Sequence, residues 1–586
     1  MSLNTQSLQP LIQFIYSVAD QVLINTYEPS KYKDVILPMT VIRRLDSVLE
    51  PSKDKVLENY EKYKGKLNDL TTVLTSKKTG SGQAFYNTSK YTLKTLLDDP
   101  KNLRSNFENY LNGFSDNVQD IISKFKFRNE IETLDEGNKL FSTIEKFVSP
   151  KIDLRPESLP PLAMGYVFED LLRRFNEATN AEAGRHFTPR EIIELMTHLL
   201  FLPVKDNIQT GTFLIYDPCT GSGAMLTESK KYITDPDGEI QSKAKIHLYG
   251  QENTPTIYAI SKSDMLLKGE DPDKIVFGST LSQYGFDREM KFDFMLTNPP
   301  YGTSWADDKK ALSVGDKGKI IDPRFRVGTS RVNDGQLMFV LHMLSKMKET
   351  DQGSRIASVH NGSALFTGDA GQGESEIRKY FIEKDLLEAI IALPNNIFYN
   401  TGIPTYIFIF SNRKPEYRKG KIQLINANGE KFFSKMRKPL GSKRNELLKE
   451  HINEITRLYL SFGESEYSKI FDNSVFGYSQ IIVHRPERDE NGKIIYASKG
   501  KPKSDSKLKD IENIPLKDDI QEFFEREVLP FASDAWFDER ENKTGYEINF
   551  AKYFYKHIPP RPLSEIARDI FAIEQETEGL LKEIIS

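Results

Sequence analysis

Cysteine is almost absent from this chain, because only Cys219 carries a thiol among its 586 residues. A single thiol forms neither an internal disulfide nor a cysteine-ligated zinc site. The eight histidines show no metal-ligand spacing such as His-Glu-x-x-His. The sequence therefore predicts a protein without a structural or catalytic metal.

Long apolar runs are also missing, since no stretch approaches the roughly 18 residues of a membrane span. The first ten residues are uncharged and polar, unlike the basic and apolar segments of a signal peptide. We therefore expect a cytoplasmic protein with no membrane contact.

Positive charge is not in excess either, because the formal net charge is −4. A protein that grips DNA by itself normally clusters Lys and Arg, so another chain would have to supply part of any such grip.

The composition is ordinary for a globular protein, with 28% charged and 38% hydrophobic residues, and the length predicts roughly three or four domains. Apolar residues at helical spacing predict an N-terminal helical domain over residues 1–150. Helices alternate with short β-rich runs over 151–430, which is typical of an α/β fold with a mainly parallel sheet. Leu387 to Leu393 and Thr405 to Phe410 are expected to be late strands of that sheet. Residues 431–586 are expected to form a mixed, mostly helical C-terminal region.

The most informative run is Asn298-Pro299-Pro300-Tyr301, which closes an apolar strand. The lone pair of an exocyclic amine on a nucleobase is delocalised into the ring, so the amine must be reshaped before it can attack. The Asn298 side chain and the Pro299 carbonyl are acceptors that can hold both N–H bonds, and the prolines hold them in an extended, preorganised geometry. Tyr301 offers a flat ring to a base swung out of a duplex. The run favours a methyltransferase that acts on a planar amine, although an ordinary turn after a strand is the alternative.

A second run supplies the context. Phe213 to Tyr216 reads as a strand, Asp217 to Gly223 as a glycine turn, and Ala224 onward as a helix. Glycines let the backbone approach a ligand closely, and the helix N-terminus favours an anionic group. The next strand ends at Gln251-Glu252, where an acid suits a ribose diol. A dehydrogenase is the alternative for this half, and Asn-Pro-Pro-Tyr argues against it.

A third element precedes both. Thr188 followed by Pro189 and Glu191 matches a capping box at the start of a helix. From local sequence this structural interpretation is the better supported one, and it does not exclude that the segment forms a wall of a cofactor site.

These motifs, in this order, resemble the modification (methylation) subunit of type I restriction-modification systems. The resemblance rests on Phe187-Thr188-Pro189-Arg190, the Asp217 to Gly221 turn, Gln251-Glu252 and Asn298 to Tyr301. Later stretches are similar too, so the likeness extends from about Leu11 to the end of the chain. They are Gly373 to Lys379, Ala389 to Pro394, Tyr399 to Thr405 and Gly545 to Tyr555.

The resemblance implies a Rossmann-like, S-adenosylmethionine-dependent DNA methyltransferase that modifies adenine at N6. The residues implied to border the cofactor are Arg185, His186, Phe187, Thr188, Pro189 and Arg190. Those implied to cradle its methionine part are Asp217, Gly221, Ser222 and Gly223, and Glu252 would hold the ribose. Asn298, Pro299, Pro300 and Tyr301 would hold the flipped adenine. Where the family often carries an acid at the third strand tip, this chain has Ser279, which could still hydrogen-bond the cofactor's adenine. Transfer would be direct and in line, with no covalent role for Cys219.

The last helix is the best indication of a partner. Apolar residues recur at alternating steps of four and three, which predicts a seam for another helix. They are Ile566, Ile570, Ile573, Thr577, Leu580 and Ile584. Docking on its own domain is the alternative. In the family this region is expected to contact the specificity subunit, which would read the DNA sequence. The resemblance also implies a second methylation subunit and a separate restriction and translocation subunit, since this chain lacks the Gly-x-x-x-x-Gly-Lys-Ser/Thr nucleotide loop.

Two charged segments are less specific. Residues 307–331 could track phosphates beside the flipped base, or could be a solvated mobile loop. Their basic residues are Lys309, Lys310, Lys317, Lys319, Arg324, Arg326 and Arg331. The segment from Arg485 to Lys509 is expected to be disordered surface.

Two other functions are compatible with the motifs. The same pocket could methylate a protein glutamine amide or an RNA base. A non-catalytic scaffold could also keep the fold and only bind partners, but the intact Asp217, Glu252 and Asn298 argue against it.

Overall fold

The computed structural model describes residues 5–178, 187–314, 319–399, 401–497, 500–555 and 561–585. The chain divides into a large compact unit, Met1–Ile548, and a small one, Asn549–Ser586. In the described part of both units, no helix has the length and apolar character needed to cross a bilayer.

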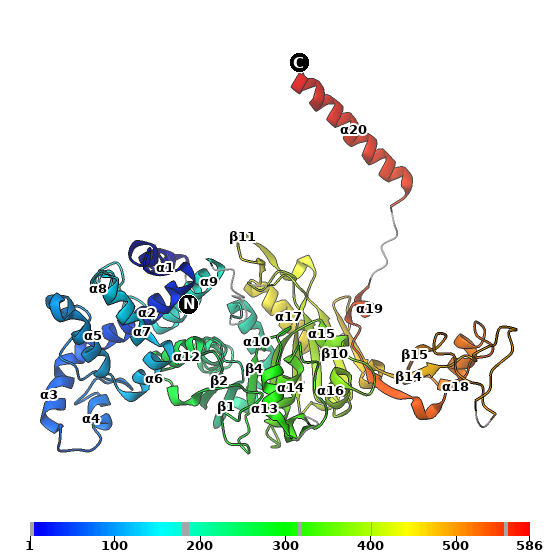
Figure 1. The fold of residues 1–586 in the computed structure, drawn as a ribbon, viewed down its shortest axis with the longest axis horizontal. Coiled ribbons are helices and arrows are strands. Elements are labelled where there is room, and N and C mark those ends of the chain that lie inside the picture. The colour runs from blue at the N-terminus through cyan, green and yellow to red at the C-terminus, as the bar shows by residue number, and fades with distance from the viewer. Residues whose placement is uncertain are drawn as a thin grey trace. The chain divides into compact units, whose positions relative to one another are not determined.

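The described residues before 179 form helices and no sheet, as predicted for the N-terminal region. Their apolar faces share one core that includes Ile42, Phe107 and Phe147, all fully buried. The helices are α1 (Thr5–Val18), α2 (Tyr32–Leu49), α3 (Lys53–Tyr63), α4 (Thr71–Thr75), α5 (Leu103–Asn112), α6 (Asp116–Phe125), α7 (Phe127–Glu136), α8 (Leu140–Phe147) and α9 (Pro161–Ala178). Figure 1 shows them in blue to cyan.

A nine-stranded sheet follows, in the order β13-β10-β8-β9-β7-β4-β1-β2-β3. All neighbours run parallel except around β9 and at the β10–β13 pair, which confirms the predicted mainly parallel sheet. Both predicted late strands are present, as β8 and β9. The strands are β1 (Thr212–Asp217), β2 (Lys245–Glu252), β3 (Ile275–Phe277), β4 (Phe294–Thr297), β7 (Arg355–Asn361), β8 (Leu387–Ala392), β9 (Thr405–Ser411), β10 (Lys421–Asn426) and β13 (Ser468–Asp472).

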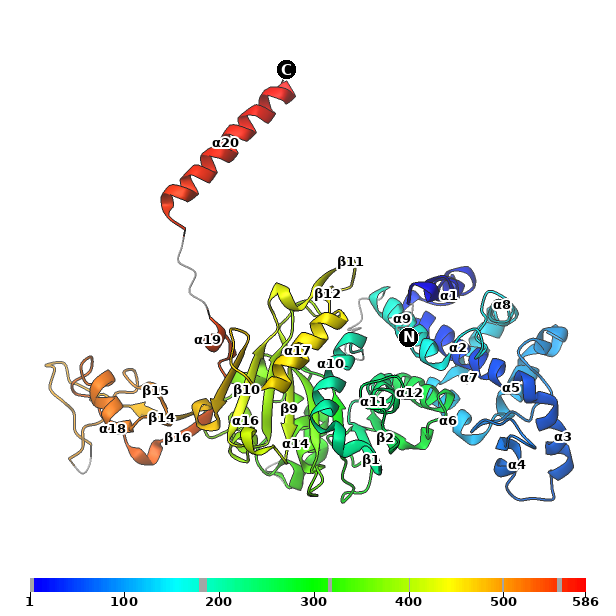
Figure 2. The same ribbon diagram turned by 180° about the vertical axis from the view of Figure 1, so that it is seen from behind.

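Helices cover both faces of the sheet because successive strand residues point to opposite sides. Ile215 of β1 belongs to the core shared with α10 (Arg190–Phe201), α11 (Ala224–Thr234) and α17 (Lys449–Ser461). Its neighbour Tyr216 faces the other side, where its hydroxyl lies 3.2 Å from His342 Nε2 of α14 (Gln336–Ser345). On that same side Phe381 of α16 (Gly373–Glu383) packs against Phe410 of β9. Figure 2 shows α10 and α17 beside these strands from behind.

The helix α12 (Pro255–Leu267) joins the sheet to the N-terminal helices. Ile257 and Ile260 are buried in the helical core, and α12 packs against α6. Asp120 of α6 accepts hydrogen bonds from Tyr258 Oη and Lys262 Nζ, both at 2.9 Å. The helix that follows β2 is therefore fixed on both sides.

Beyond residue 430 the chain contains strands as well as helices. The edge strand β13 extends the central sheet past the predicted boundary at 430, and the division into three domains stays a prediction. The strands outside the central sheet, which lie on both sides of residue 430, are β5 (Ser313–Val314), β6 (Lys319–Ile320), β11 (Ser434–Leu440), β12 (Lys443–Glu446), β14 (Gly477–Val483), β15 (Asp510–Pro515) and β16 (Lys543–Tyr546). The remaining helices of the large unit are α13 (Ala306–Leu312), α15 (Ser363–Phe366) and α18 (Ile520–Phe523).

The prediction that the segment from Arg485 to Lys509 is disordered is wrong for its described residues. The main chain around Glu487 pairs with two later stretches of the segment. Glu487 N donates to Lys503 O and Ile495 N donates to Glu487 O, both at 2.8 Å. Arg485 also pairs with Asp534 at 3.2 Å. These main-chain hydrogen bonds order the segment, although its local composition is typical of a loop.

The small unit contains α19 (Phe550–Phe554) and α20 (Leu563–Ile585). The second of these is the predicted terminal helix. Leu563, Ile570 and Phe571 on it are 85%, 59% and 64% exposed.

Candidate active site

Three of the predicted motifs meet at one edge of the sheet. In the sheet β1 lies between β2 and β4, and all three strands run parallel. Asp217 ends β1, Glu252 ends β2, and Asn298 directly follows β4. The carboxyl ends of parallel strands share one edge, and ligands of open α/β sheets bind there.

Two cavities open between these strand ends. The larger has a volume of about 340 Å³ and the smaller about 20 Å³. Cys219, Gly221 and Asn298 line both, so the cavities adjoin at the glycine turn and at Asn298. Glu252, Ser279 and Pro300 line the larger, whereas Thr188, Asp217 and Ser222 line the smaller. Together the two cavities bring eight of the predicted site residues to one place.

Asp217 ties the ends of two strands together. Its Oδ1 accepts hydrogen bonds from the backbone N–H of Cys219 and from Thr297 Oγ1, each at 2.9 Å. The residue is only 1% exposed, and burial raises the pKa of its carboxyl to about 7. Asp217 therefore fixes the shape of the turn at the tip of β1.

The turn itself needs glycine at two positions. Gly221 and Gly223 have φ angles of 56° and 86°, in the left-handed region that favours glycine. A Cβ atom on Gly223 would lie 2.8 Å from Met265 Cε. The backbone N–H of Gly221 donates to Glu252 Oε2 at 3.1 Å, so the turn also orients the acid at the tip of β2. Burial raises the pKa of Glu252.

Asn298 has one satisfied and one unsatisfied polar atom. Its Nδ2 donates to Thr188 Oγ1 at 3.1 Å. Its Oδ1 is buried, and none of the described residues donates a hydrogen bond to it. Buried polar atoms are nearly always hydrogen-bonded in proteins, so this acceptor beside two cavities marks a place for a ligand donor.

The predicted capping box is wrong. The helix α10 begins at Arg190 with Pro189 as its N-cap and has no side-chain cap. Thr188 contacts Asn298 instead, and Glu191 accepts a hydrogen bond from Lys443 Nζ. The side chains of Thr188 and Glu191 therefore bind residues distant in the sequence in place of the helix N-terminus that the local pattern predicted.

Arg190 is held in ion pairs. Its guanidinium contacts Glu169 at 2.8 Å and Glu228 at 2.5 Å, and Ser222 Oγ donates to the same Glu169. Arg190 therefore braces the glycine turn through α9 and α11, and it lines neither cavity.

The other predicted residues lie close by without lining the two cavities. They are Phe187, Pro189, Gly223, Pro299 and Tyr301. Burial raises the pKa of the Tyr301 hydroxyl to about 12. Arg185 and His186 lie outside the described residues. In the described ranges no group of three or more His, Cys, Asp or Glu side chains could hold a metal ion.

A sequence model of the N-6 DNA methylase family matches residues 162–481, which is more than half of the chain and includes every strand of the nine-stranded sheet. The chain belongs to the N-6 DNA methylase family. A second model, the HsdM N-terminal domain, matches residues 11–147. The matches confirm the family that the motifs indicated.

Relatives of this methylase family member are methylase subunits. It is 27% identical over 360 residues to the type I restriction enzyme MjaIX methylase subunit of Methanocaldococcus jannaschii, covering 60% of this chain and 57% of that protein. It is 27% identical over 317 residues to the EcoKI methylase subunit of Escherichia coli, covering 50% of this chain and 53% of that protein. The match thus spans little more than half the length of these relatives.

Solved structures agree on the fold. The methyltransferase subunit of a type I restriction-modification system from Streptococcus thermophilus superposes with a TM-score of 0.59 at 22% identity, covering 80% of this chain and 96% of that one. The predicted methyltransferase fold is confirmed.

Sequence reasoning missed part of the cavity wall in this family member. Trp305, Asp308 and Phe339 also line the larger cavity. Trp305 and Asp308 follow the Asn-Pro-Pro-Tyr run within ten residues, and that proximity was the available signal. Phe339 comes from α14, far along the chain, where nothing local marks it.

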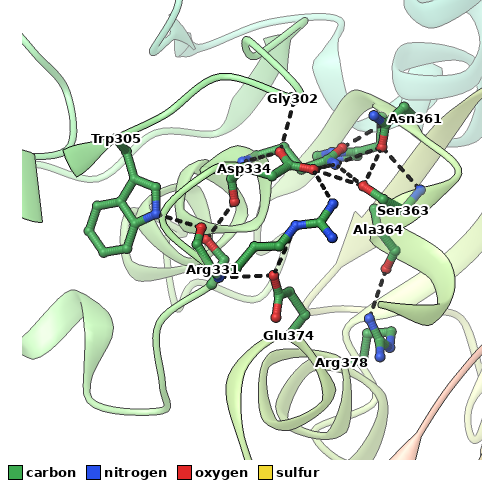
Figure 3. A network of polar contacts seen from close by, with 12 residues as sticks. Gly302, Trp305, Arg331, Asp334, Asn361, Ser363, Ala364, Glu374 and Arg378 are labelled. Atoms are coloured by element: carbon green, nitrogen blue, oxygen red, sulfur yellow. Dashed lines mark hydrogen bonds and ion pairs between the residues drawn. The ribbon is translucent and has the colours of Figure 1, made fainter. Parts of the chain in front are cut away.

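A polar network holds the segment after Tyr301 in place (Figure 3). Gly302 N donates to Asp334 Oδ1 at 3.1 Å, and Trp305 Nε1 donates to the carbonyl of Arg331 at 3.0 Å. Asp334 in turn accepts from Ser363 Oγ at 2.8 Å. The wall made by Trp305 is therefore anchored to the loop before α14 and, through Asp334, to α15.

The basic segment 307–331 is only partly available for phosphates. Arg324 is 5% exposed and pairs with Asp322 at 2.8 Å. Arg331 pairs with Asp334 at 3.4 Å. Arg326 and Lys310 are exposed, and Lys317 lies outside the described residues. Two of the seven basic side chains are thus committed to contacts within the protein.

Proposed function

We propose that this chain is the methylation subunit of a type I restriction-modification complex. It transfers a methyl group from S-adenosylmethionine to N6 of an adenine flipped out of DNA, and a separate specificity subunit chooses the sequence. The observation that carries the proposal is the buried Oδ1 of Asn298, an acceptor without a protein donor beside two adjoining cavities. Membership in the N-6 DNA methylase family supports the same reaction.

The residues at the strand tips fit the cofactor. Gly221 and Gly223 adopt positive φ angles, which cost glycine less than other residues, and the turn leads into α11, whose N-terminus favours a carboxylate. Glu252 is an acceptor that suits a ribose diol. In this proposal the smaller cavity takes the methionine part and the larger takes the nucleoside, with Asn298 where the two adjoin.

The catalytic work of the protein is positioning. When bound, S-adenosylmethionine would supply the methyl group that the amine nitrogen takes up, with S-adenosylhomocysteine as the leaving group and the surplus proton of the nitrogen released to water. Asn298 Oδ1 and the Pro299 carbonyl accept the two N–H bonds, which directs the nitrogen lone pair out of conjugation and toward the carbon. Asn298 Nδ2 donates to Thr188 Oγ1 at 3.1 Å, so the amide is held in place and its acceptor Oδ1 is oriented before the base binds. Tyr301 stacks on the flipped base.

The thiol of Cys219 takes no part in this reaction. Burial, together with the nearby Asp217 and Glu252, raises the pKa of Cys219 well above its ordinary value. A thiol that stays protonated is a poor nucleophile, so covalent attack on a base through Cys219 is not part of the reaction.

The proposed partners follow from the small unit and the overall charge. The predicted seam of the terminal helix α20 is exposed at Ile566 and Ile570, which suit a helix of the specificity subunit. A second methylation subunit and a restriction and translocation subunit complete the proposed complex. The net charge of −4 fits a chain whose DNA contacts are shared with partners.

The test is methyl transfer by the full chain co-expressed with the specificity subunit encoded beside it. Labelled methyl groups should enter duplex DNA as N6-methyladenine. The variant Asn298→Ala should lose this labelling while keeping its folded spectrum, and Asn491→Ala, which changes an exposed asparagine outside both cavities, is the matched control. Labelling that survives Asn298→Ala would refute the role of this residue. Labelling of protein or RNA in place of DNA would instead support the other substrates that the motifs allow.

A further inference from the structure

The larger cavity has an acidic wall that the family motifs do not explain. Asp308 of α13 lines it together with Ser279 and Glu252. Two hydroxyls donate to Asp308 Oδ1, from Ser279 at 2.5 Å and from Ser282 at 2.6 Å. Both serines lie directly after β3, so the carboxylate of a distant helix is held at the tip of that strand. Among the described residues, none donates to the second oxygen, Oδ2.

The main-chain carbonyls on this wall each accept a hydrogen bond already. The carbonyl of Ser279 accepts from Gln283 N at 2.9 Å. The carbonyls of Thr280 and Leu281 accept from the two terminal nitrogens of Arg324 at 2.8 Å and 2.7 Å. Both carboxylate oxygens of Glu252 also accept hydrogen bonds, from the backbone N–H groups of Gly221 and Thr254. Asp308 Oδ2 is therefore the carboxylate oxygen of this wall that has no donor among the described residues.

The position of the wall indicates which part of a ligand it meets. The strand β3 pairs with β2 on the side away from β1. A ribose held by Glu252 at the tip of β2 places its base in the same cavity, beside the residues that follow β3. An ionised carboxylate only accepts hydrogen bonds, so it favours a base edge that carries an amino group and disfavours one that carries a carbonyl oxygen.

We infer that Asp308 is a specificity-determining residue for the cofactor, accepting a hydrogen bond from the 6-amino group of its adenine at Oδ2. The inference rests on the proposed function, because it takes the nucleoside to lie in the larger cavity. Ser279 and Ser282 are positioning residues that hold the carboxylate in place. The acid that the tip of β3 lacks in this chain is thus supplied by α13, and Ser279 acts through Asp308.

The experiment compares two ligands, S-adenosylhomocysteine and S-inosylhomocysteine, which differ by a 6-amino group or a 6-carbonyl oxygen on the purine and by the hydrogen that the 6-oxo purine carries on N1. Their dissociation constants are measured by calorimetry on the full chain without DNA, for the wild type, Asp308→Asn and Asp307→Asn. The wild type should prefer the adenosyl ligand. In Asp308→Asn the serines still have an oxygen to bind, but an amide N–H can face the base. Binding of the adenosyl ligand should weaken by about 10- to 100-fold, and the preference over the inosyl ligand should shrink by at least about tenfold.

The control and the ratio make the result decisive. Asp307 is exposed, so Asp307→Asn makes the same charge change on the neighbouring residue and should leave both constants unchanged. The melting midpoints of both variants should equal that of the wild type, which shows that the ratio is measured on folded protein. An unchanged ratio in Asp308→Asn would overturn the inference and leave the proposed function standing. A wild-type protein that binds neither ligand would overturn the proposed function itself.

Discussion

Replacing Arg324 by methionine should destabilise the wall of the larger cavity. The Arg324 side chain is only 2% exposed and pairs with Asp322 at 2.8 Å. It also donates to the carbonyls of Thr280 and Leu281 and lies 3.0 Å from His342 Nδ1. Methionine has a similar length and no donor, so the substitution leaves a carboxylate, two carbonyls and a ring nitrogen without their common partner.

The expected magnitude follows from this burial. Removing one partner of a buried ion pair costs about 3–5 kcal/mol. At about 2–4 °C per kcal/mol for a domain of this size class, the melting midpoint should fall by roughly 6–20 °C. Arg326 is exposed two residues away, and Arg326→Met should change the free energy of unfolding by no more than about 0.5 kcal/mol. Thermal unfolding followed by near-ultraviolet circular dichroism measures both variants.

The same pair of variants separates two roles for the basic segment. If Arg324 contacted a DNA phosphate, Arg324→Met would melt like the wild type, and its DNA binding would be weaker and less dependent on salt. That combination would refute the structural role derived from its contacts. The expected result is the reverse, with a lower melting midpoint and weaker binding of S-adenosylhomocysteine, because the carbonyls of the cavity wall lose their anchor.

Three further substitutions test buried groups around the sheet. Glu388→Gln should cost about 3–5 kcal/mol in urea unfolding at pH 7 because it leaves Arg355 buried without a charged partner. Burial alone would raise the pKa of Glu388, but the guanidinium of Arg355 holds it below its ordinary value, so the advantage of the wild type should shrink as the pH falls into the acid range. Burial raises the pKa of Asp217 to about 7, so the folded protein keeps a proton that the unfolded chain releases near pH 4. The stability of the wild type should therefore fall as the pH rises toward 7. In Asp217→Asn, which has no carboxyl to titrate, the melting midpoint should vary less between pH 5 and pH 8 than in the wild type. Gly223→Ala should lower the free energy of unfolding by about 1–3 kcal/mol and weaken S-adenosylhomocysteine binding, whereas Gly269→Ala, with a positive φ of 74° but open space around it, should show the backbone cost and normal binding.

The local sequence predicted the elements that carry the site. Apolar runs bounded by turns gave the strands that end at Asp217 and Glu252, and the glycine turn gave the start of α11. These predictions hold because the period of apolar residues and the φ preference of glycine act over a few residues. The order of the motifs along the chain was also sufficient to indicate the family.

Side chains with several possible partners were harder to assign. Thr188 and Glu191 match a capping box, yet they contact Asn298 and Lys443. A capping contact is worth about 1 kcal/mol, so a tertiary contact of similar strength can replace it. Arg324 looked like a surface charge because basic residues surround it in sequence, and only packing against α14 buries it.

The sequence by itself determined the family and the mainly parallel sheet, and it predicted the role of Asn298 and its neighbours, because these follow from residue type and spacing along one segment. Only the tertiary structure decided which polar atoms are left without a protein partner. Asn298 Oδ1 is such an atom because Thr188 binds the other end of its amide. Asp308 reaches the tip of β3 because two serine hydroxyls hold it there. Whether an acceptor atom has a hydrogen-bond donor within the protein depends on groups brought together from distant parts of the chain, and no local sequence pattern encodes those contacts.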